Sequence, residues 1–419
     1  MEIINKETML INECRLCKSK NLRKMFDFGS VPLGNNLQSS PNLSQNAKSF
    51  DLLIMNCISC NHFQLNTSVS PKLLYATNYT YLSGIGLSFV KHIKTYVNWV
   101  VDKTKLKKNS VVIDVGSNDG TCLECFQSKG YTVCGIDPAR KPAEIANQNG
   151  IFTINKFFNK GVVDEIIKKY DKVDVVTSQN VLAHINNLDS VFKNIYQVLR
   201  EEGYFVFEIG YFKRVLESGC FDTIYHEHID YHHANPLVKF LINLGFDVLE
   251  ISENNIQGGS LRFLLQKTGD GVIKSQPGQF LSNEKNTILY NNKKLNFWYD
   301  EVETKMKKLR EVFLKYKSKY DISYAYGAPT KATLLLKMLK LDNNDISFVV
   351  DDNKLKVNRF MPLTNIPIKS SDEIEFDKSA VIILFAWNFA DDIIKKIKEQ
   401  YKVEATIILP LPNLKVIKI

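Results

Sequence analysis

One short segment of the chain concentrates side chains that can move protons or bind a metal ion. Residues 225–233 read Tyr-His-Glu-His-Ile-Asp-Tyr-His-His and hold four of the seven histidines. Histidine has the unperturbed side-chain pKa nearest neutrality, so this cluster indicates either general acid–base chemistry or a metal site. A zinc-protease motif reads His-Glu-x-x-His, and here Asp230 stands where its second histidine is needed. The segment therefore favours proton transfer.

Two pairs of cysteines near the N-terminus predict a structural metal site. Cys14 and Cys17 form one C-x-x-C pair, and Cys57 and Cys60 form a second pair after residues 18–56. Four thiolates with this spacing suit a tetrahedral Zn²⁺ ion. Disulfide bonds are the alternative, and a reducing cytoplasm would disfavour them. Because four sulfur ligands leave no open coordination position, we expect the zinc to stabilise a small domain and not to catalyse.

Residues 111–138 carry the pattern of a strand, a polar turn, a helix and a second strand. The apolar run over 111–115 leads into Gly-Ser-Asn-Asp-Gly at 116–120, and a second strand over 131–136 ends at an aspartate. This is the first β-α-β unit of a doubly wound sheet, in which an acid after the second strand binds ribose hydroxyls. The acid at position 119 would repel a dinucleotide's pyrophosphate, so the cationic adenosine ligand S-adenosylmethionine fits better. The alternative is an ordinary turn with a surface aspartate.

The pattern continues with further strands and the residues that follow them. We expect strands over 173–178 and 203–208, with an amphipathic helix over 188–199 between them. In an open α/β sheet, ligands bind at the carboxyl ends of the strands. The residues expected to line the cofactor site there are Asp114, Gly116, Ser117, Asn118, Asp119, Asp137, Pro138 and Asn180. The histidine-rich segment comes later in the chain, and we expect it to fold back over the same edge.

Composition limits what the protein binds. The chain is 44% hydrophobic and 24% charged, which is ordinary for a globular protein. No apolar run is long enough to span a membrane, and the N-terminus lacks the apolar core of a signal peptide. We therefore expect a cytoplasmic protein without membrane contact, and a monomer by default. The net charge of +9 is spread over many lysines, without a basic stripe interleaved with aromatics, so a nucleic-acid partner is not favoured.

Several motifs in a fixed order give the chain a resemblance to a known family. Besides the cysteine pairs and the loop at 114–120, they are Tyr-His-Glu-His at 225–228, Gly-Gly-Ser-Leu-Arg at 258–262 and Tyr-Gly-Ala-Pro-Thr-Lys at 326–331. With these motifs the chain resembles, over nearly its whole length, the deoxysugar C-methyltransferases. Those enzymes methylate a ring carbon of nucleotide-linked 4-keto-6-deoxysugars.

The resemblance implies an α/β protein of three domains. A zinc-binding domain is expected over residues 1–75, followed by a Rossmann-like class I methyltransferase domain over residues 76–268. A Rossmann-like domain with leading helices, which helps to hold the nucleotide sugar, is expected over residues 269–419.

The resemblance also implies catalytic residues. His228 ends the family's Tyr-x-Glu-His pattern and is the expected base. Glu227 is expected to orient an imidazole or bind a sugar hydroxyl, and Tyr225 to donate to the carbonyl oxygen or hold the base. His184 matches another histidine implicated in the family, and Tyr79 matches a tyrosine near the sugar.

Three further residues are expected to bind the substrate. Tyr81 is the alternative match for the family tyrosine near the sugar, and Arg262 ends the Gly-Gly-Ser-Leu-Arg motif. Lys331 stands near the start of a predicted helix, where an ammonium group and backbone N–H groups would meet a diphosphate. The alternative for Lys331 is a surface lysine.

These residues suit methylation of a carbon atom. A neighbouring carbonyl makes the ring C–H acidic, a neutral base removes the proton, and the enolate attacks the methyl group of S-adenosylmethionine. C3 is the expected position, while C5 and the identity of the nucleotide stay open. A zinc-bearing nucleic-acid methyltransferase would need an Asn/Asp-Pro-Pro-Tyr motif or a Pro-Cys nucleophile, and neither is present. An inactive scaffold is a further alternative, against which the intact loop and the histidine cluster argue.

Overall fold

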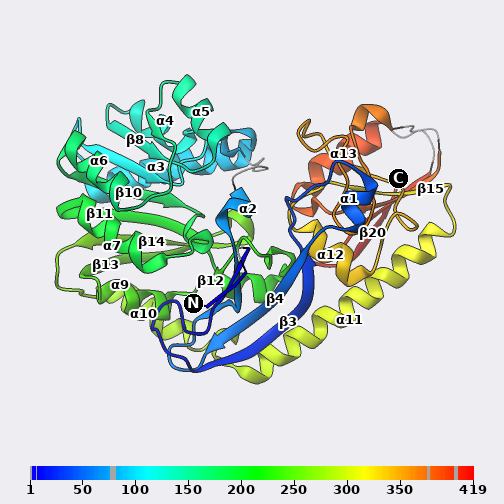
Figure 1. Cartoon of the computed structure of the whole chain (residues 1–419), viewed down its shortest axis with the longest axis horizontal. Helices are drawn as coiled ribbons and strands as arrows, with labels where there is room; N and C mark the ends of the chain where they lie inside the picture. The colour runs from blue at the N-terminus through cyan, green and yellow to red at the C-terminus, as the bar shows by residue number, and fades with distance from the viewer. Residues whose placement is uncertain (1, 6, 76–81, 375–377, 401–403) are drawn as a thin grey trace. The chain divides into compact units, whose positions relative to one another are not determined.

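The computed structural model describes residues 2–5, 7–75, 82–374, 378–400 and 404–419 of the chain (Figure 1). The chain divides into two compact units. The first unit holds Met1–Met25, Ile54–Arg214 and Glu227–Asn291. The second unit holds Phe26–Leu53, Val215–His226 and Asn292–Ile419. Each unit is built from segments far apart in sequence, and the histidine-rich segment at 225–233 is divided between them.

A seven-stranded sheet forms the centre of the first unit, in the order β13-β14-β11-β10-β7-β8-β9. Its strands are β7 (Val111–Val115), β8 (Thr132–Ile136), β9 (Thr153–Ile154), β10 (Val173–Gln179), β11 (Leu199–Gly210), β13 (Phe246–Asn254) and β14 (Ser260–Lys267). The strands from β11 to β9 are parallel, whereas β14 is antiparallel to both of its neighbours. Strand order reverses between β7 and β10, and ligands of doubly wound sheets bind at such a point.

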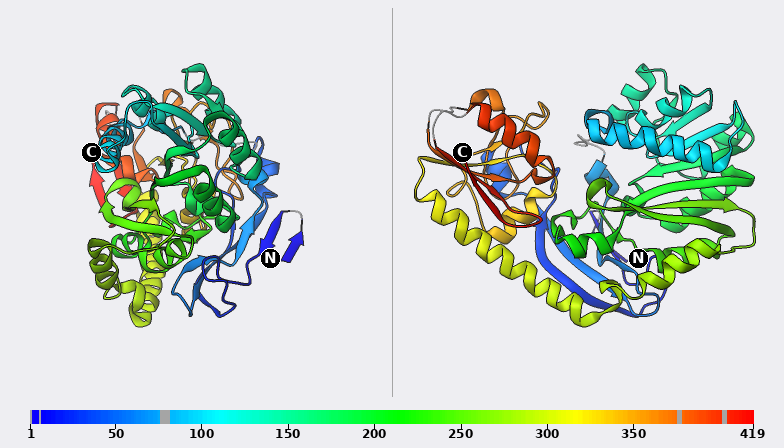
Figure 2. Two further views of the ribbon diagram at one scale, coloured as in Figure 1. Left: turned by 90° about the vertical axis from the view of Figure 1, so that its left-hand side faces the viewer. Right: turned by 180° about the vertical axis from the view of Figure 1, so that it is seen from behind.

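Helices cover both faces of this sheet. They are α3 (Leu87–Thr104), α4 (Thr121–Gln127), α5 (Arg140–Gln148), α6 (Lys160–Tyr170), α7 (Leu188–Val198) and α9 (Ala234–Ile242). One buried core joins apolar residues of α3 and α4 to the sheet, and Figure 2 shows α3 in light blue along that face. On the other face, Phe192 of α7 packs edge-on against Phe205 and Phe207 of β11. The expected helix over 188–199 is confirmed, and Asn187 caps it by accepting a hydrogen bond from the Ser190 N–H.

Two smaller sheets flank the cysteine pairs. One has the order β1-β2-β6, with β1 (Glu2–Asn5), β2 (Thr8–Leu10) and β6 (Thr67–Val69). The other has the order β12-β5-β4-β3, with β3 (Leu22–Pro32), β4 (Ser49–Cys57), β5 (Phe63–Leu65) and β12 (Asp230–Tyr231). The histidine-rich segment therefore contributes an edge strand to a sheet of the cysteine-bearing region.

The second unit contains a six-stranded sheet in the order β17-β16-β15-β18-β19-β20. Its strands are β15 (Ile322–Tyr326), β16 (Val349–Val350), β17 (Ile368–Lys369), β18 (Ala380–Leu384), β19 (Ala405–Leu409) and β20 (Lys415–Lys418), and only β20 runs antiparallel. Helices of this unit include α1 (Pro41–Gln45), α11 (Asn292–Lys317), α12 (Ala332–Leu339) and α13 (Ala390–Gln400). The order reverses at β15, so this sheet has the Rossmann-like arrangement that was expected from the resemblance.

The turn after β15 needs a glycine. Gly327 has a φ of +88°, and an added Cβ would lie 2.4 Å from Cβ of Ala386, which follows β18. No side chain fits there, so the turns after these two neighbouring strands approach each other closely. Among the helices that the structure describes, none has the length and apolar character needed to cross a membrane.

Candidate active site and zinc site

The turn between β7 and α4 is shaped by backbone conformations that few residues tolerate. Gly116 has a φ of +78°, and an added Cβ would lie 2.3 Å from Cγ2 of Val181. Asn118 has a φ of 51°, a region that asparagine adopts more readily than most residues. Its backbone N–H donates to Oδ2 of Asp137 at 2.8 Å. The predicted cofactor turn and the acid after β8 therefore lie together.

Two buried carboxyl groups stand beside this turn. Asp137, directly before Pro138, also accepts a hydrogen bond from the Ala139 N–H at 2.7 Å, yet burial raises its pKa to about 6. Burial, together with the nearby Asp137 carboxylate, raises the pKa of Asp114 to about 8. Carboxyl groups in such surroundings favour a ligand that brings hydroxyl groups or positive charge.

Three buried side-chain atoms around the turn have no hydrogen-bond partner in the described part of the chain. They are Oδ1 of Asp114, Oγ of Ser117 and Nδ2 of Asn180. Leaving buried polar atoms unpaired costs free energy, so a polar ligand that pairs with them would stabilise the site. This set of donors and acceptors fits the nucleoside part of S-adenosylmethionine.

A short 3₁₀ helix, η1 (Ser83–Ile85), lies against the turn and was missed from the sequence. The Ser83 N–H donates to Oδ1 of Asn118 at 2.9 Å, and the Gly84 N–H donates to Oδ2 of Asp119 at 2.8 Å. An added Cβ at Gly84 would lie 3.1 Å from the Asp119 carboxylate. The side chains of Asn118 and Asp119 thus hold η1 against the turn. The Ser-Gly-Ile-Gly run at 83–86 is the sequence signal that could have indicated this close approach.

His184 and His228 lie together in the first unit. Their ring centroids are 4.8 Å apart and their planes meet at 64°, which is an edge-to-face contact. His184 ends the 3₁₀ helix η2 (Leu182–His184), which follows β10. Burial and the neighbouring His228 lower the pKa of His184 to about 3. Hydrogen bonds with the backbone of Glu227 and Asn180 act in the opposite direction and raise this pKa, but by less. The His184 imidazole is therefore neutral at pH 7. It lies beside His228 and is hydrogen-bonded to the backbone of Glu227, both predicted catalytic residues, and to the backbone of Asn180, a predicted cofactor residue.

The other histidines of the segment are buried in structural surroundings. In the second unit, Nε2 of His226 lies 3.0 Å from a backbone carbonyl oxygen, and burial lowers the pKa of His226 to about 4. In the first unit, Nδ1 of His233 lies 3.1 Å from Oε2 of Glu284. Burial lowers the pKa of His232 to about 3, and neither of its ring nitrogens has a hydrogen-bond partner among the described residues. The hydrogen bonds described for His226 and His233 therefore do not involve His184 or His228.

The structure does not bring the predicted tyrosines and Glu227 together in one unit. Tyr79 and Tyr81 lie outside the described residues. Tyr225 falls in the second unit, whereas Glu227, which is buried, falls with His228 in the first unit. The roles expected for these residues therefore stay predictions.

Arg262 is held by a buried carboxylate. Its guanidinium donates to Oε1 of Glu208 at 2.8 Å and 2.7 Å, and its Cζ lies 4.7 Å from the ring centroid of Trp99. Asn254 donates to the same Oε1 at 2.8 Å, and Nε2 of His92 lies 2.6 Å from Oε2. A substrate bound by Arg262 would have to share the guanidinium with Glu208.

Lys331, in the second unit, directly precedes α12 and is paired with a buried acid. Its Nζ lies 3.4 Å from Oδ2 of Asp222 and 3.7 Å from the ring centroid of Trp387. The Nε1–H of Trp387 donates to the same Oδ2 at 2.6 Å. Burial lowers the pKa of Lys331 and raises the pKa of Asp222. Lys331 is therefore not an ordinary surface lysine, and an anionic ligand would compete with Asp222 for it.

The four cysteines predicted to bind zinc converge in the first unit. Sγ of Cys14 lies 3.5 Å from Sγ of Cys60, Sγ of Cys17 lies 3.6 Å from Sγ of Cys57, and all four sulfurs lie within 4.8 Å of one another. Tetrahedral Zn–S bonds of about 2.3 Å would set the sulfurs about 3.8 Å apart, whereas a disulfide bond is about 2.0 Å long. The hydrogen bond with Cys60 lowers the pKa of Cys14 to about 4. This geometry fits a closed four-thiolate zinc site and no disulfide.

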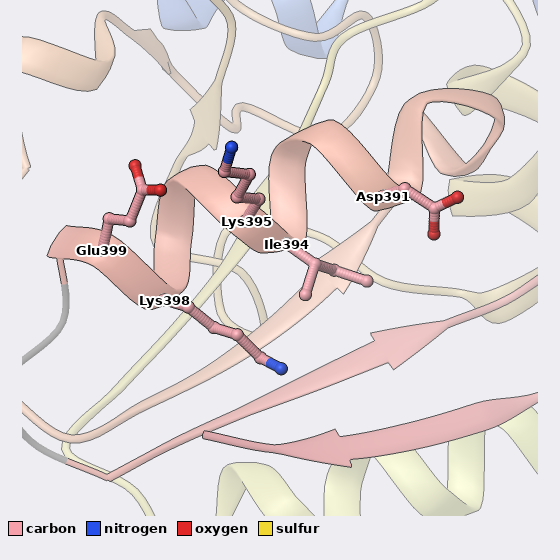
Figure 3. Close-up of a pocket in the computed structure, with 5 residues that line it drawn as sticks. All are labelled: Asp391, Ile394, Lys395, Lys398 and Glu399. Atoms are coloured by element: carbon pink, nitrogen blue, oxygen red, sulfur yellow. The ribbon is translucent and has the colours of Figure 1, made fainter.

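A surface hollow beside α13 is not a candidate site. The residues that line it, Asp391, Ile394, Lys395, Lys398 and Glu399, all belong to this one helix. Figure 3 shows Lys395 and Lys398 pointing away from the helix in different directions. Enclosing a ligand requires residues from more than one element, and no residue predicted from the sequence lies here.

Three family models match successive parts of the chain. A "Putative zinc binding domain" matches residues 14–75, a "Methyltransferase domain" matches residues 92–251, and a "C-methyltransferase C-terminal domain" matches residues 255–412. The C-methyltransferase NovU from Streptomyces niveus is 29% identical over 408 residues, which cover 97% of each chain.

Two more distant similarities each cover less than half of this chain. The ubiquinone biosynthesis O-methyltransferase of Pelagibacter ubique (strain HTCC1062) is 27% identical over 122 residues, which cover 29% of this chain and half of that protein. Among solved structures, magnesium protoporphyrin IX methyltransferase from Synechocystis PCC 6803 covers 43% of this chain and 79% of its own, at 15% identity and a TM-score of 0.33.

The fold and the cofactors follow from these findings. The chain has an α/β, Rossmann-like methyltransferase fold with a zinc-binding domain at its N-terminal side, as the sequence predicted. Its methyl donor is S-adenosylmethionine, and the cluster of four cysteines is a structural zinc site.

Proposed function

We propose that this enzyme transfers the methyl group of S-adenosylmethionine to a ring carbon, C3, of an NDP-4-keto-6-deoxysugar. The reaction would form a branched deoxysugar. Two similarities support carbon as the acceptor: the match along 97% of the chain to a protein named as a C-methyltransferase, and the C-methyltransferase model over residues 255–412. The observation that carries the proposal is the edge-to-face contact of the partly exposed His184 and His228 rings, which lie in the same unit as the cofactor turn.

The chemistry requires a base and no catalytic metal. Bound S-adenosylmethionine supplies an electrophilic methyl group on a positively charged sulfur. His228 takes the proton from the carbon next to the sugar carbonyl, and the C–H electron pair moves into an enolate. The enolate carbon forms the new C–C bond while the bond between sulfur and methyl breaks. The proton remains on His228, S-adenosylhomocysteine leaves, and the proton then passes to solvent.

The charge state of His184 suits this assignment. Because burial and His228 hold the pKa of His184 at about 3, His184 does not take up the proton itself. A neutral imidazole beside the base can orient the base and accept a hydrogen bond from the imidazolium that forms. We assign Glu227 to orienting an imidazole or binding a sugar hydroxyl, and Tyr225 to the developing oxyanion. Tyr79, or Tyr81 in its place, would contact the sugar.

The remaining parts of the chain would bind the substrate and stabilise the fold. We assign residues 1–75 to the zinc domain, 76–268 to the methyltransferase domain and 269–419 to the nucleotide-sugar domain. Lys331 is our candidate ligand of the diphosphate, and Arg262 is a second candidate ligand of the substrate. Each is already paired with a carboxylate, so an anionic substrate would share or replace that partner. We expect the enzyme to act in the cytoplasm as a monomer.

The test is a transfer assay with a panel of acceptors. The purified protein is incubated with ¹³C-methyl S-adenosylmethionine and dTDP-, GDP- and CDP-linked 4-keto-6-deoxyhexoses. We expect one acceptor to gain a methyl group whose ¹³C signal couples to a ring carbon at C3. Coupling to C5 would correct the position, and a methyl group on oxygen or nitrogen would overturn the proposal. A protein that binds S-adenosylmethionine but methylates none of these sugars would also overturn it.

A further inference from the structure

Arg15 stands inside the first cysteine pair and is almost fully buried, at 4% exposure. Its Nε donates to both carboxylate oxygens of Asp230, at 2.8 Å and 2.9 Å. Nη1 donates to the carbonyl oxygen of Asn186 at 2.9 Å, and Nη2 donates to the carbonyl oxygen of Ile185. One guanidinium group therefore binds three residues that are far from it in the sequence.

These three residues belong to the two segments that carry the histidine pair. Ile185 and Asn186 directly follow His184, and Asp230 comes two residues after His228. The guanidinium is a rigid planar fork, so it fixes the separation and orientation of the groups that it joins. A change in its position would move both histidine-bearing segments.

Backbone hydrogen bonds link the same segments to each other and to the region of the cysteines. The Ile229 N–H donates to the carbonyl oxygen of Ala183 at 2.8 Å, and the Leu65 N–H donates to the carbonyl oxygen of Ile229 at 2.8 Å. Asp230 pairs with Gln64 of β5 in antiparallel register. The side-chain Oε1 of Gln64 in turn accepts a hydrogen bond from the backbone N–H of Arg15 at 2.8 Å.

The second cysteine pair reinforces this connection. His62, two residues after Cys60, is fully buried, and its Nε2 lies 2.9 Å from Oδ1 of Asp230. Asp230 is therefore held from both cysteine pairs, by Arg15 from the first and by His62 after the second. Because zinc binding fixes the backbone of each cysteine pair, it also fixes the positions of the Cα atoms of Arg15 and His62.

We propose that Arg15 is a positioning residue through which the zinc site sets the geometry of the His184–His228 pair. The zinc takes no part in the chemistry, yet its four ligands hold Arg15, and Arg15 holds the two histidine-bearing segments. The effect on turnover rests on the proposed function of His228, whereas the effect on the segments themselves does not. Loss of this contact lowers kcat and leaves the binding of S-adenosylmethionine unchanged.

The test compares the Arg15→Lys variant with the same substitution at another arginine near the cysteine pairs. Lysine keeps the charge, but its donors all lie on one nitrogen and cannot reproduce the planar fork that spans the carboxylate and the two carbonyl oxygens. The control is Arg23→Lys, because Arg23 donates to Oδ1 of Asn56, the residue before Cys57. For each variant, zinc content, S-adenosylmethionine affinity, kcat, KM and the hydrogen-exchange rate of the Ile229 amide are measured.

For Arg15→Lys we expect normal zinc content and S-adenosylmethionine affinity, with Ile229 exchange and kcat both changed. A misplaced catalytic group costs a factor of about 10 to 100 in rate, so kcat should fall by at least about 10-fold without a matching rise in KM. Ile229 exchange should rise by a similar factor, while Arg23→Lys resembles the wild type. The proposal is overturned if Arg15→Lys keeps wild-type kcat and Ile229 exchange, or if kcat falls while Ile229 exchange does not change.

Two further arms keep the test decisive. If Arg15→Lys does not fold, the wild-type chain is treated with a zinc chelator and exchange at Ile229 is compared with exchange at Val176 of β10. Faster exchange at Ile229 with continued protection at Val176 supports the proposal, and equal protection at both overturns it. If the wild type methylates no ketosugar while Arg15→Lys still speeds Ile229 exchange, the proposed function fails and the positioning role stands.

Discussion

The imidazole rings of His184 and His228 meet edge to face with their centroids 4.8 Å apart. His184 follows a strand of the central sheet, and His228 comes just before an edge strand of the sheet that also contains the end of β4 at Cys57. The pair therefore joins the cofactor-binding sheet to the zinc-bearing region. Burial and the neighbouring His228 lower the pKa of His184 to about 3, so the His184 imidazole is neutral at pH 7.

Replacing the base should separate catalysis from cofactor binding. We expect His228→Asn to lower kcat by about 100-fold or more, since a general base contributes about 10²- to 10⁴-fold. S-adenosylmethionine affinity, measured by calorimetry, should stay within about 2-fold of the wild type, because the cofactor turn is built without His228.

The control for this variant is His226→Gln, in the same segment. His226 is hydrogen-bonded to a backbone carbonyl oxygen, so this change should affect stability more than turnover. Near-normal kcat in His228→Asn would remove His228 from its role as the base.

The cofactor turn should not tolerate a side chain at its first glycine. In Gly116→Ala the new Cβ would lie 2.3 Å from Val181, on a backbone with a φ of +78°. We expect a loss of about 2–4 kcal/mol of unfolding free energy from strain and overpacking, with weaker S-adenosylmethionine binding.

Gly210→Ala is the matched control, because an added Cβ at Gly210 meets nothing within 4 Å. Thermal unfolding and calorimetry measure both variants. If Gly116→Ala and Gly210→Ala lose equal stability and equal affinity, the close approach of Val181 does not shape the turn.

The cysteine cluster should hold one zinc ion per chain. We expect Cys60→Ser to lose zinc and to unfold at lower temperature, because a structural zinc site contributes directly to folding. Elemental analysis and thermal unfolding measure both effects. Cys134→Ser is the control, since Cys134 is a buried thiol outside the cluster. Full zinc content in Cys60→Ser would show that the site has other ligands.

The buried His232 should make the fold sensitive to acid. Burial lowers the pKa of His232 to about 3 in the fold, with Asp230, His62, Arg15 and His233 as the charged or titratable groups facing it. The unfolded chain therefore binds one more proton between about pH 6.5 and pH 3, and the wild type loses stability as the pH falls through this range.

His232→Phe removes this group and its proton. Relative to the wild type, the variant should gain about 2 kcal/mol of unfolding free energy between pH 7.5 and pH 5. Packing costs of the larger ring do not depend on pH, so they cancel in this difference. Urea unfolding at the two pH values measures it, and a difference that stays constant with pH contradicts the assignment.

Lys331 should act on substrate binding and not on the chemical step. If it binds the diphosphate, Lys331→Met raises the KM for the nucleotide sugar by about 10-fold or more, since it removes a charge-assisted contact, and leaves kcat nearly unchanged. Lys395→Met, on the surface of α13, is the control. Unchanged KM would mean that the pairing of Lys331 with Asp222 is purely structural.

Local features of this protein were predictable because they depend on neighbours in the sequence. The glycine turn at 116–120 and the strand at 111–115 follow from residue types and from the alternation of apolar and polar segments. The closed cysteine cluster follows from two C-x-x-C pairs, since each pair already places two thiols on one turn of chain. Strand length depends less on such local signals: in the second unit, only Val349 and Val350 of the run 346–350 pair with β15.

The roles of the histidines and charged residues depended instead on partners distant in the chain. The sequence by itself determined the glycine turn after β7 and the four cysteines that meet, and the family resemblance implied the second Rossmann-like part. Only the tertiary structure decided that His184 meets His228, that Glu208 and Asp222 pair with Arg262 and Lys331, and that Arg15 binds Asp230. The physical reason is that pairing stabilises a buried polar group, and which partner it finds depends on how distant segments pack together.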